Sequence, residues 1–105
     1  MHVGIFADLS VSESLKEYLQ IYGFDVTILN QESGLSGQFD RLVVDFRIGN
    51  LVATDLLRGN NTPAILITGW TDDETIRMLK ESSLPYLIHP FKASELASML
   101  LNYER

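Results

Sequence analysis

Hydrophobic residues along the chain follow two patterns that alternate with one another. Runs of consecutive aliphatic residues are typical of strands buried on both faces, and apolar residues spaced three and four apart are typical of helices. The first pattern predicts strands at 3–6, 42–44, 64–67 and 86–88. Residues 24–28 instead alternate between apolar and polar, which predicts a strand at the edge of a sheet.

The helical pattern occupies most of the intervals between these strands. Apolar stripes predict one helix over 10–22, another over 71–80 and a last one that ends with the chain. Capping-box patterns at 10–13 and 71–74 mark the expected first turns of two of them. Strands that alternate with helices predict a single α/β domain over 1–105, with a parallel sheet covered by helices on both faces.

Two segments interrupt this alternation. Residues 30–38 contain two glycines and two serines, and their only apolar residue is Leu35, which predicts a loop or at most one helical turn. After a loop at 47–50, residues 51–58 allow only a short helix, which Gly59 ends.

Both reduced segments are expected on the same side of the sheet. Apolar surface around Leu29, Leu35, Leu51 and Val52 would then be partly uncovered. Exposed apolar patches commonly bind a partner or a second copy of the chain, so a homodimer is one expectation. The alternative is that the loop at 30–38 folds over this surface and covers it.

Composition excludes several classes of function. The net charge is −6 and the 8 basic residues are scattered, which argues against direct binding to nucleic acid through its phosphates. The absence of cysteine excludes disulfides and thiolate metal sites and suits a reducing cytoplasm. No charged leader or long apolar segment is present, so neither secretion nor insertion in a membrane is expected.

Polar side chains stand where four of the predicted strands end. Asp45 directly follows Leu42, Val43 and Val44, and Asp8, Thr68 and His89 lie at or just past the ends of three other strands. The carboxyl ends of parallel strands meet at one edge of the sheet, where α/β proteins bind ligands. We therefore expect these four side chains to gather there, although each also has an ordinary structural explanation.

This ordered set resembles the receiver domain of bacterial two-component response regulators. Leu42–Asp45 is similar to the strand that ends in the phosphoryl-accepting aspartate, and Thr68 to the hydroxyl residue of the fourth strand. Tyr86 is similar to the switch aromatic, and His89, Pro90 and Phe91 to a Lys-Pro-Phe motif. The resemblance implies a flavodoxin-like fold with strand order 2-1-3-4-5, a signalling module rather than an enzyme, and a cis peptide bond before Pro90.

The resemblance also implies a set of site residues and partners. A histidine kinase or phosphotransfer protein would phosphorylate Asp45, and a downstream effector protein would sense the change. Mg²⁺ would be held by Asp8, Asp45 and the backbone carbonyl of Arg47, because this ion prefers oxygen ligands. Thr68 and His89 would contact the phosphoryl group.

The sequence departs from the family pattern at this site. Ala7 and Asp8 replace an acidic pair if Asp8 takes its second position, but an alignment without a gap places Asp8 one residue further on. One or no carboxylate of that pair then remains, so weak binding of Mg²⁺ is expected. His89 replaces a lysine and carries only part of a positive charge at neutral pH.

Two hypotheses remain for the function. The first is a phosphorylated receiver, and the second is a pseudo-receiver, an interaction module that works without phosphorylation. A P-loop or dinucleotide-binding motif is absent, and Arg47 stands where dehalogenase-type phosphatases place a second aspartate and cobalamin modules a histidine. Flavin binding is disfavoured because the residues after the first strand, 8–10, form a poor phosphate-binding loop.

Overall fold

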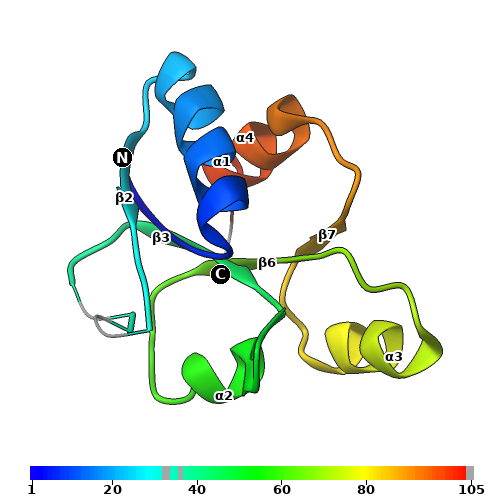
Figure 1. The fold of residues 1–105 in the computed structure, drawn as a ribbon. Coiled ribbons are helices and arrows are strands. Elements are labelled where there is room, and N and C mark those ends of the chain that lie inside the picture. Colours follow the sequence, from blue (N-terminus) through cyan, green and yellow to red (C-terminus); the bar gives the residue numbers. More distant parts are fainter. Residues whose placement is uncertain (32–33, 36, 104–105) are drawn as a thin grey trace.

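A parallel sheet of five strands forms the centre of the computed structural model, which describes residues 1–31, 34–35 and 37–103 (Figure 1). The strand order is β2-β1-β3-β6-β7, which confirms the predicted flavodoxin-like order 2-1-3-4-5 when these five strands are counted along the chain. The strands are β1 (His2–Phe6), β2 (Asp25–Ile28), β3 (Arg41–Asp45), β6 (Ala64–Thr68) and β7 (Tyr86–Ile88). β2 lies at the edge, as its alternating pattern predicts.

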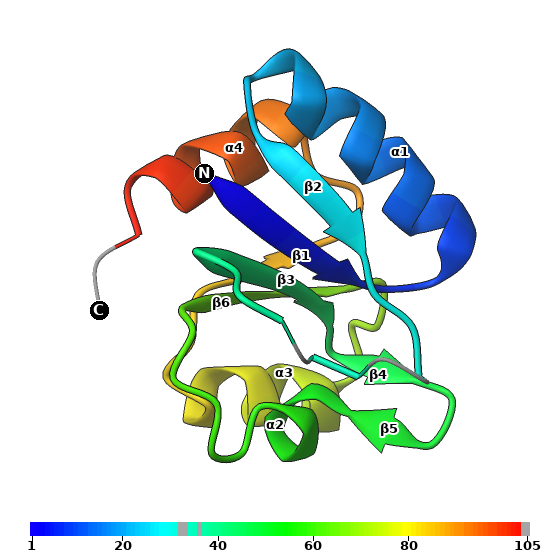
Figure 2. The same cartoon turned by 90° about the vertical axis from the view of Figure 1, so that its left-hand side faces the viewer.

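Helices cover both faces of the sheet (Figure 2). Along each central strand, successive side chains point to opposite faces. Odd-numbered residues of β1, β3 and β6 pack with α1 (Leu9–Ile21) and α4 (Ala93–Leu101) in an upper core. Even-numbered residues pack with α2 (Ala53–Leu56) and α3 (Asp73–Glu81) in a lower core. Every residue of β6 is buried because it is covered on both sides. None of the described helices is long and apolar enough to cross a membrane.

Both predicted capping boxes are misplaced. α1 begins at Leu9 after Asp8, so Ser10 lies inside the helix, and the side chain of Asp8 makes no capping hydrogen bond. Ser12 is buried in this first turn, where its hydroxyl donates to the carbonyl oxygen of Ala7 at 3.1 Å. α3 is capped by Asp72 rather than Thr71.

The apolar stripe of α1 is also narrower than predicted. Leu15 and Leu19 are buried in the upper core, whereas Tyr18 and Tyr22 are half exposed. The two tyrosines continue the apolar spacing of the helix but lie at the margin of the buried face. Spacing alone therefore predicts a wider buried face than the helix has.

Asp72→Ala is expected to lower the melting temperature at neutral pH. The Asp72 carboxylate accepts hydrogen bonds from the backbone N–H and the hydroxyl of Thr75, at 3.1 and 2.8 Å, and these bonds lower the pKa of Asp72. A lowered pKa means that this stabilisation is full above pH 3.8, the unfolded value, and is lost as the pH falls through the folded pKa. Thermal melts between pH 2 and 7 should show that the difference in melting temperature between the wild type and Asp72→Ala becomes smaller in acid. Asp73→Ala is the control: it removes an exposed acidic side chain that does not cap the helix and should change the melting temperature less.

The segment after β3 forms a hairpin where a loop and the start of a helix were predicted. β4 (Arg47–Ile48) pairs antiparallel with β5 (Leu51–Val52), and α2 spans only Ala53–Leu56. Gly49 has a φ of +57° at the first position of the two-residue turn, where a type II′ turn favours glycine. The turn therefore directs Leu51 and Val52 into a strand.

The partly uncovered apolar face that the sequence predicts is not present in the described residues. Leu29 is buried, and Leu35, Leu51 and Val52 pack against the lower core. The described part of the segment 30–38 forms turns and no helix, as expected; residues 32, 33 and 36 lie outside the described residues. The described residues of the segment pack on this side of the sheet through Leu35, which supports the alternative explanation that the loop folds over this surface.

His2 fastens the end of this segment to the sheet. Its Nδ1–H donates to the carbonyl oxygen of Gln38 at 3.1 Å, and its Nε2 is hydrogen-bonded to the hydroxyl group of Thr27 at 2.7 Å. The ring also packs against Phe39, with 4.7 Å between ring centroids. The backbone N–H of His2 donates to the carboxylate of Asp40 at 2.7 Å. These contacts hold the chain in place just before β3 begins.

Candidate functional site

Strand pairing brings the predicted site residues to one edge of the sheet. Phe6 is level with Val44, and Asp45 is level with Ile67. Residues 7 and 8, which follow β1, therefore lie on one side of Asp45. Thr68, the last residue of β6, lies on its other side. Thr68 is in turn level with Ile88, so His89 leaves β7 at the same edge.

Asp45 has a half-buried carboxylate, one of whose oxygens is already bonded. The backbone N–H of Arg47 donates to Oδ1 at 3.1 Å, and the N–H of Phe46 ties the chain to the carbonyl oxygen of Ile67 at 2.7 Å. Burial raises the pKa of Asp45, while the N–H of Arg47 opposes this rise. The charge of Asp8 raises the pKa further, and His89 lowers it. Asp8 and His89 therefore both lie close enough to act on Asp45.

Asp8 is exposed at the start of α1. The register of β1 places Ala7 directly after the Phe6–Val44 pair and Asp8 one residue further along the chain. The charge of Asp8 raises the pKa of Asp45.

Thr68 is buried at the end of β6, and its hydroxyl oxygen contacts the loop that follows. This oxygen accepts a hydrogen bond from the backbone N–H of Trp70 at 3.0 Å. The carbonyl oxygen of Thr68 accepts from the N–H of His89 at 2.8 Å, which joins the ends of β6 and β7. The Trp70 side chain is 54% exposed beyond this turn. The Trp70 N–H and the Arg47 N–H are contacts that sequence reasoning missed, because neither depends on the identity of the side chain.

His89 and Tyr86 lie at opposite ends of β7. The His89–Pro90 peptide bond is cis, as predicted, and the His89 ring packs against Phe91 with 4.6 Å between centroids. Tyr86 is half-buried, is level with Leu66 and packs against the lower core. Tyr86 is therefore two residues from the strand end that carries the site.

The oxygen atoms at this edge suit Mg²⁺ in kind but are few. Among the residues that the structure describes, no group of three or more histidine or acidic side chains could hold a metal ion. Two interacting carboxylates, Asp8 and Asp45, and the carbonyl of Arg47 remain as oxygen donors. Mg²⁺ keeps several water ligands and needs only one or two protein carboxylates, so this donor set fits the ion, though with little charge to hold it.

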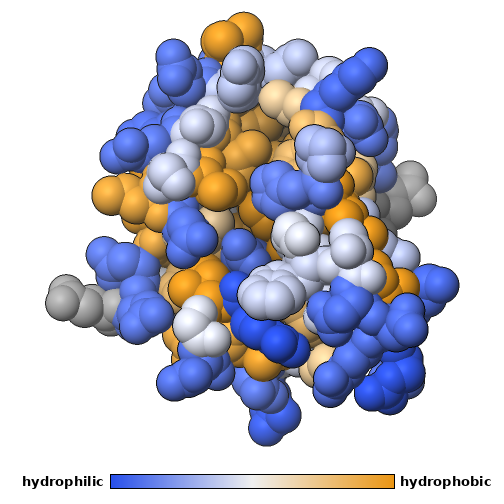
Figure 3. All heavy atoms as spheres, turned by 45° about the vertical axis from the view of Figure 1, so that its right-hand side comes forward, coloured by the Kyte–Doolittle hydropathy of each residue, from blue (hydrophilic) through white to orange (hydrophobic). Residues whose placement is uncertain are grey.

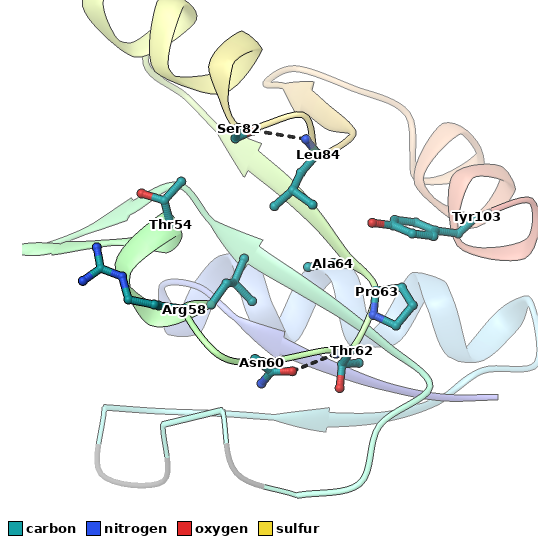
Figure 4. Close-up of a pocket in the computed structure, with 10 residues that line it drawn as sticks. Thr54, Arg58, Asn60, Thr62, Pro63, Ala64, Ser82, Leu84 and Tyr103 are labelled. Carbon is teal, nitrogen blue, oxygen red and sulfur yellow. Dashed lines mark hydrogen bonds between the residues drawn. The ribbon is translucent and has the colours of Figure 1, made fainter. Parts of the chain in front are cut away.

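A separate pocket of about 280 Å³ lies at the opposite edge of the sheet, where β6 begins (Figure 4). Two of its polar groups are already used within the protein: Asn60 accepts from the N–H of Thr62, and Ser82 accepts from the N–H of Leu84. Arg58 forms an ion pair with Asp55 at 3.1 Å. This pocket has no connection with the Asp45 site.

Comparison with known proteins places the fold. No family model and no curated protein sequence matches the chain. The signal receiver domain of a diguanylate cyclase from Desulfovibrio desulfuricans G20 superposes with a TM-score of 0.79 and 25% identity, over 95% of this chain and 90% of that one. The Francisella response regulator 1452 receiver domain gives 0.75 and 24%, over 95% and 92%. Vibrio cholerae chemotaxis protein CheY4 gives 0.76 and 16%, over 98% and 97%. The chain has the fold of a response-regulator receiver domain.

Proposed function

We propose that the domain accepts a phosphoryl group on Asp45 from a histidine kinase or phosphotransfer protein. The observation that carries the proposal is the Asp45 carboxylate at the carboxyl edge of the sheet, between Asp8 and Thr68. Its Oδ1 accepts the Arg47 N–H, and Oδ2 has no hydrogen bond within the part of the chain described. Oδ2 is thus the free nucleophile.

The reaction exchanges one bond to phosphorus for another. Asp45 Oδ2 forms a bond to the phosphorus atom, the bond between phosphorus and the donor imidazole breaks, and an acyl phosphate is left on Asp45. Bound at Asp8, Asp45 and the Arg47 carbonyl, Mg²⁺ would neutralise phosphoryl oxygens. Thr68 can donate its hydroxyl hydrogen to one of these oxygens, and His89 adds positive charge when protonated.

A change at Thr68 can reach the surface through the loop it holds. The Thr68 hydroxyl accepts the Trp70 N–H, so movement of this hydroxyl toward a phosphoryl group would change that contact. Tyr86, on the neighbouring strand, is the proposed switch side chain. A downstream effector protein would recognise the altered surface, which carries the exposed Trp70.

The pseudo-receiver is the second candidate, and two observations favour it. His89 replaces the lysine of the family pattern, and the described residues contain no group of three acidic or histidine ligands. In that case the same surface would bind a partner without phosphorylation.

Incubation with acetyl phosphate separates these candidates. In the presence of Mg²⁺, intact mass should show one added phosphoryl group, which alkaline hydroxylamine should remove because it cleaves acyl phosphates. Omitting Mg²⁺ should reduce the labelling. A protein that stays unmodified while it still binds a partner would support the pseudo-receiver.

Mg²⁺ is expected to bind weakly, with half-saturation in the millimolar range rather than the micromolar. Asp8 is the only acidic residue supplied by the end of β1, and a hard cation is held less tightly when ligand charge is removed. The fluorescence of Trp70, the only tryptophan, should report the titration. Asp8→Asn should weaken binding further, and Asp73→Asn, an exposed acid on α3, should not. Saturation at micromolar Mg²⁺ would contradict the expectation.

A further inference from the structure

A second hollow lies beside Asp8, at the same edge of the sheet as Asp45. Its volume is about 410 Å³, within the range of small-molecule sites. Figure 2 shows the segments around it: the turn from β1 into α1, the chain that leaves β2, and β4 of the hairpin. It is lined by Phe6, Ala7, Asp8, Leu9, Ile28, Leu29, Asn30, Gln31 and Ile48.

Most of the residues in this lining are apolar. Phe6 and Leu29 are buried in the lower core, and Ile28 and Ile48 are half-buried. Leu9 is 65% exposed although it lines the pocket. A ligand with an apolar chain that covers Leu9 would remove from water an apolar surface that the folded protein leaves exposed.

Among the residues that the structure describes, Asp8 is the only ionisable side chain in the lining. It does not cap α1, and it has no ion pair within the described part of the chain. The two amides in the described lining, on Asn30 and Gln31, are neutral. An anion would be repelled by Asp8 and by Asp45 at the same edge of the sheet, so the charge complement of this pocket is a cation.

We propose that the pocket binds an ammonium or guanidinium group on a short apolar stem. The cation lies beside Asp8, and the stem contacts Leu9, Ile28 and Ile48. Such a group can belong to a free amine or to a lysine or arginine side chain of a partner protein. Its charge opposes Mg²⁺ at Asp8, so occupation of the pocket weakens Mg²⁺ binding. The binding itself does not depend on phosphorylation of Asp45.

Three small probes test both halves of this chemistry in the absence of Mg²⁺ and phosphodonor. Butylammonium has both the apolar stem and the positive charge. Methylammonium has the charge without the stem, and 1-butanol has the stem without the charge. Amide shifts of ¹⁵N-labelled protein should saturate with butylammonium at the lining residues. Methylammonium should bind about tenfold more weakly, because it lacks the three further methylene groups of butylammonium and the pocket is expected to bury a little more than half of their surface. Equal shifts with butylammonium and methylammonium at one ionic strength would mean charge screening only and would overturn the proposal.

Matched variants then locate the site. Leu9→Ala removes an exposed side chain, so the fold should persist while butylammonium binds several-fold more weakly. Leu101→Ala changes a leucine of similar exposure on α4 and should leave binding unchanged. Asp8→Asn should abolish the preference for butylammonium over 1-butanol. If Leu9→Ala binds as the wild type does, the pocket is not the site.

A blocked lysine distinguishes the two sources of the cation. Nα-acetyl-lysine methylamide carries the same butylammonium group on a peptide backbone. Shifts at the same residues with similar affinity assign the pocket to a partner side chain, and loss of binding assigns it to a free amine. Failure of butylammonium itself would refute the pocket without bearing on whether Asp45 accepts a phosphoryl group.

Discussion

Asp45→Asn is expected to accept no phosphoryl group and to melt at a higher temperature than the wild type at neutral pH. The first effect follows because an amide oxygen is a poor nucleophile toward phosphorus. The second follows because burial raises the pKa of Asp45, so the folded protein must hold an ionised carboxylate in a place that disfavours it. The amide has the same shape and no charge.

The gain in stability should depend on pH in one direction. Below pH 3.8, the unfolded value, Asp45 is protonated in both states, and the wild type and the variant should be equally affected by acid. As the pH rises through the raised folded pKa, the wild type loses stability relative to Asp45→Asn, and above that pKa the difference is constant. Thermal melts across this range measure it. Asp25→Asn, at an exposed position of β2, is the control. A variant that is less stable than the wild type at neutral pH would contradict this account of Asp45.

Leu35→Asp is expected to destabilise the fold by about 2 to 3 kcal/mol and to leave its association state unchanged. Leu35 packs against the lower core, so the variant loses apolar burial and places a carboxylate there. Chemical denaturation gives the free energy of unfolding, and analytical ultracentrifugation gives the association state.

Leu101→Asp is the matched control for this substitution. Leu101 is 61% exposed on α4, so its replacement should change stability by less than about 0.5 kcal/mol. If Leu35→Asp instead kept its stability and abolished self-association, Leu35 would be an interface residue and the packing described above would be wrong.

The sheet could be predicted because no other arrangement buries all the apolar residues of its central strands. Runs such as 42–44 and 64–67 are apolar at every position, and only a strand covered on both faces buries them all. Positions of helix ends were less certain, since Asp8 and Asp72 compete with nearby Ser and Thr as first-turn residues. The choice between them depends on where the preceding strand stops.

Long-range contacts decided the parts that the sequence could not. Leu35 is one apolar residue in a polar segment, and its burial depends on the chain being held at His2 and Gln38. Leu51 and Val52 suit a helix or a strand equally, and the turn at Gly49 selects the strand.

The candidate site could also be predicted only in part. The meeting of its residues at one edge of the sheet follows from the topology, whereas the position of Asp8 relative to Asp45 depends on the register between β1 and β3. A shift of one residue in that register would change the charge beside Asp45. The pocket beside Asp8 has no sequence signature other than the missing helix after β2.

The turn of the β4–β5 hairpin is a suitable position for a spectroscopic label that reports on the site. Asn50 is exposed in this turn, and the other end of the same strand pair holds Arg47, whose N–H binds Asp45. The chain has no cysteine, so Asn50→Cys would introduce a single thiol and accept one fluorophore or spin label without background. A label there would report in real time on any rearrangement that begins at Asp45.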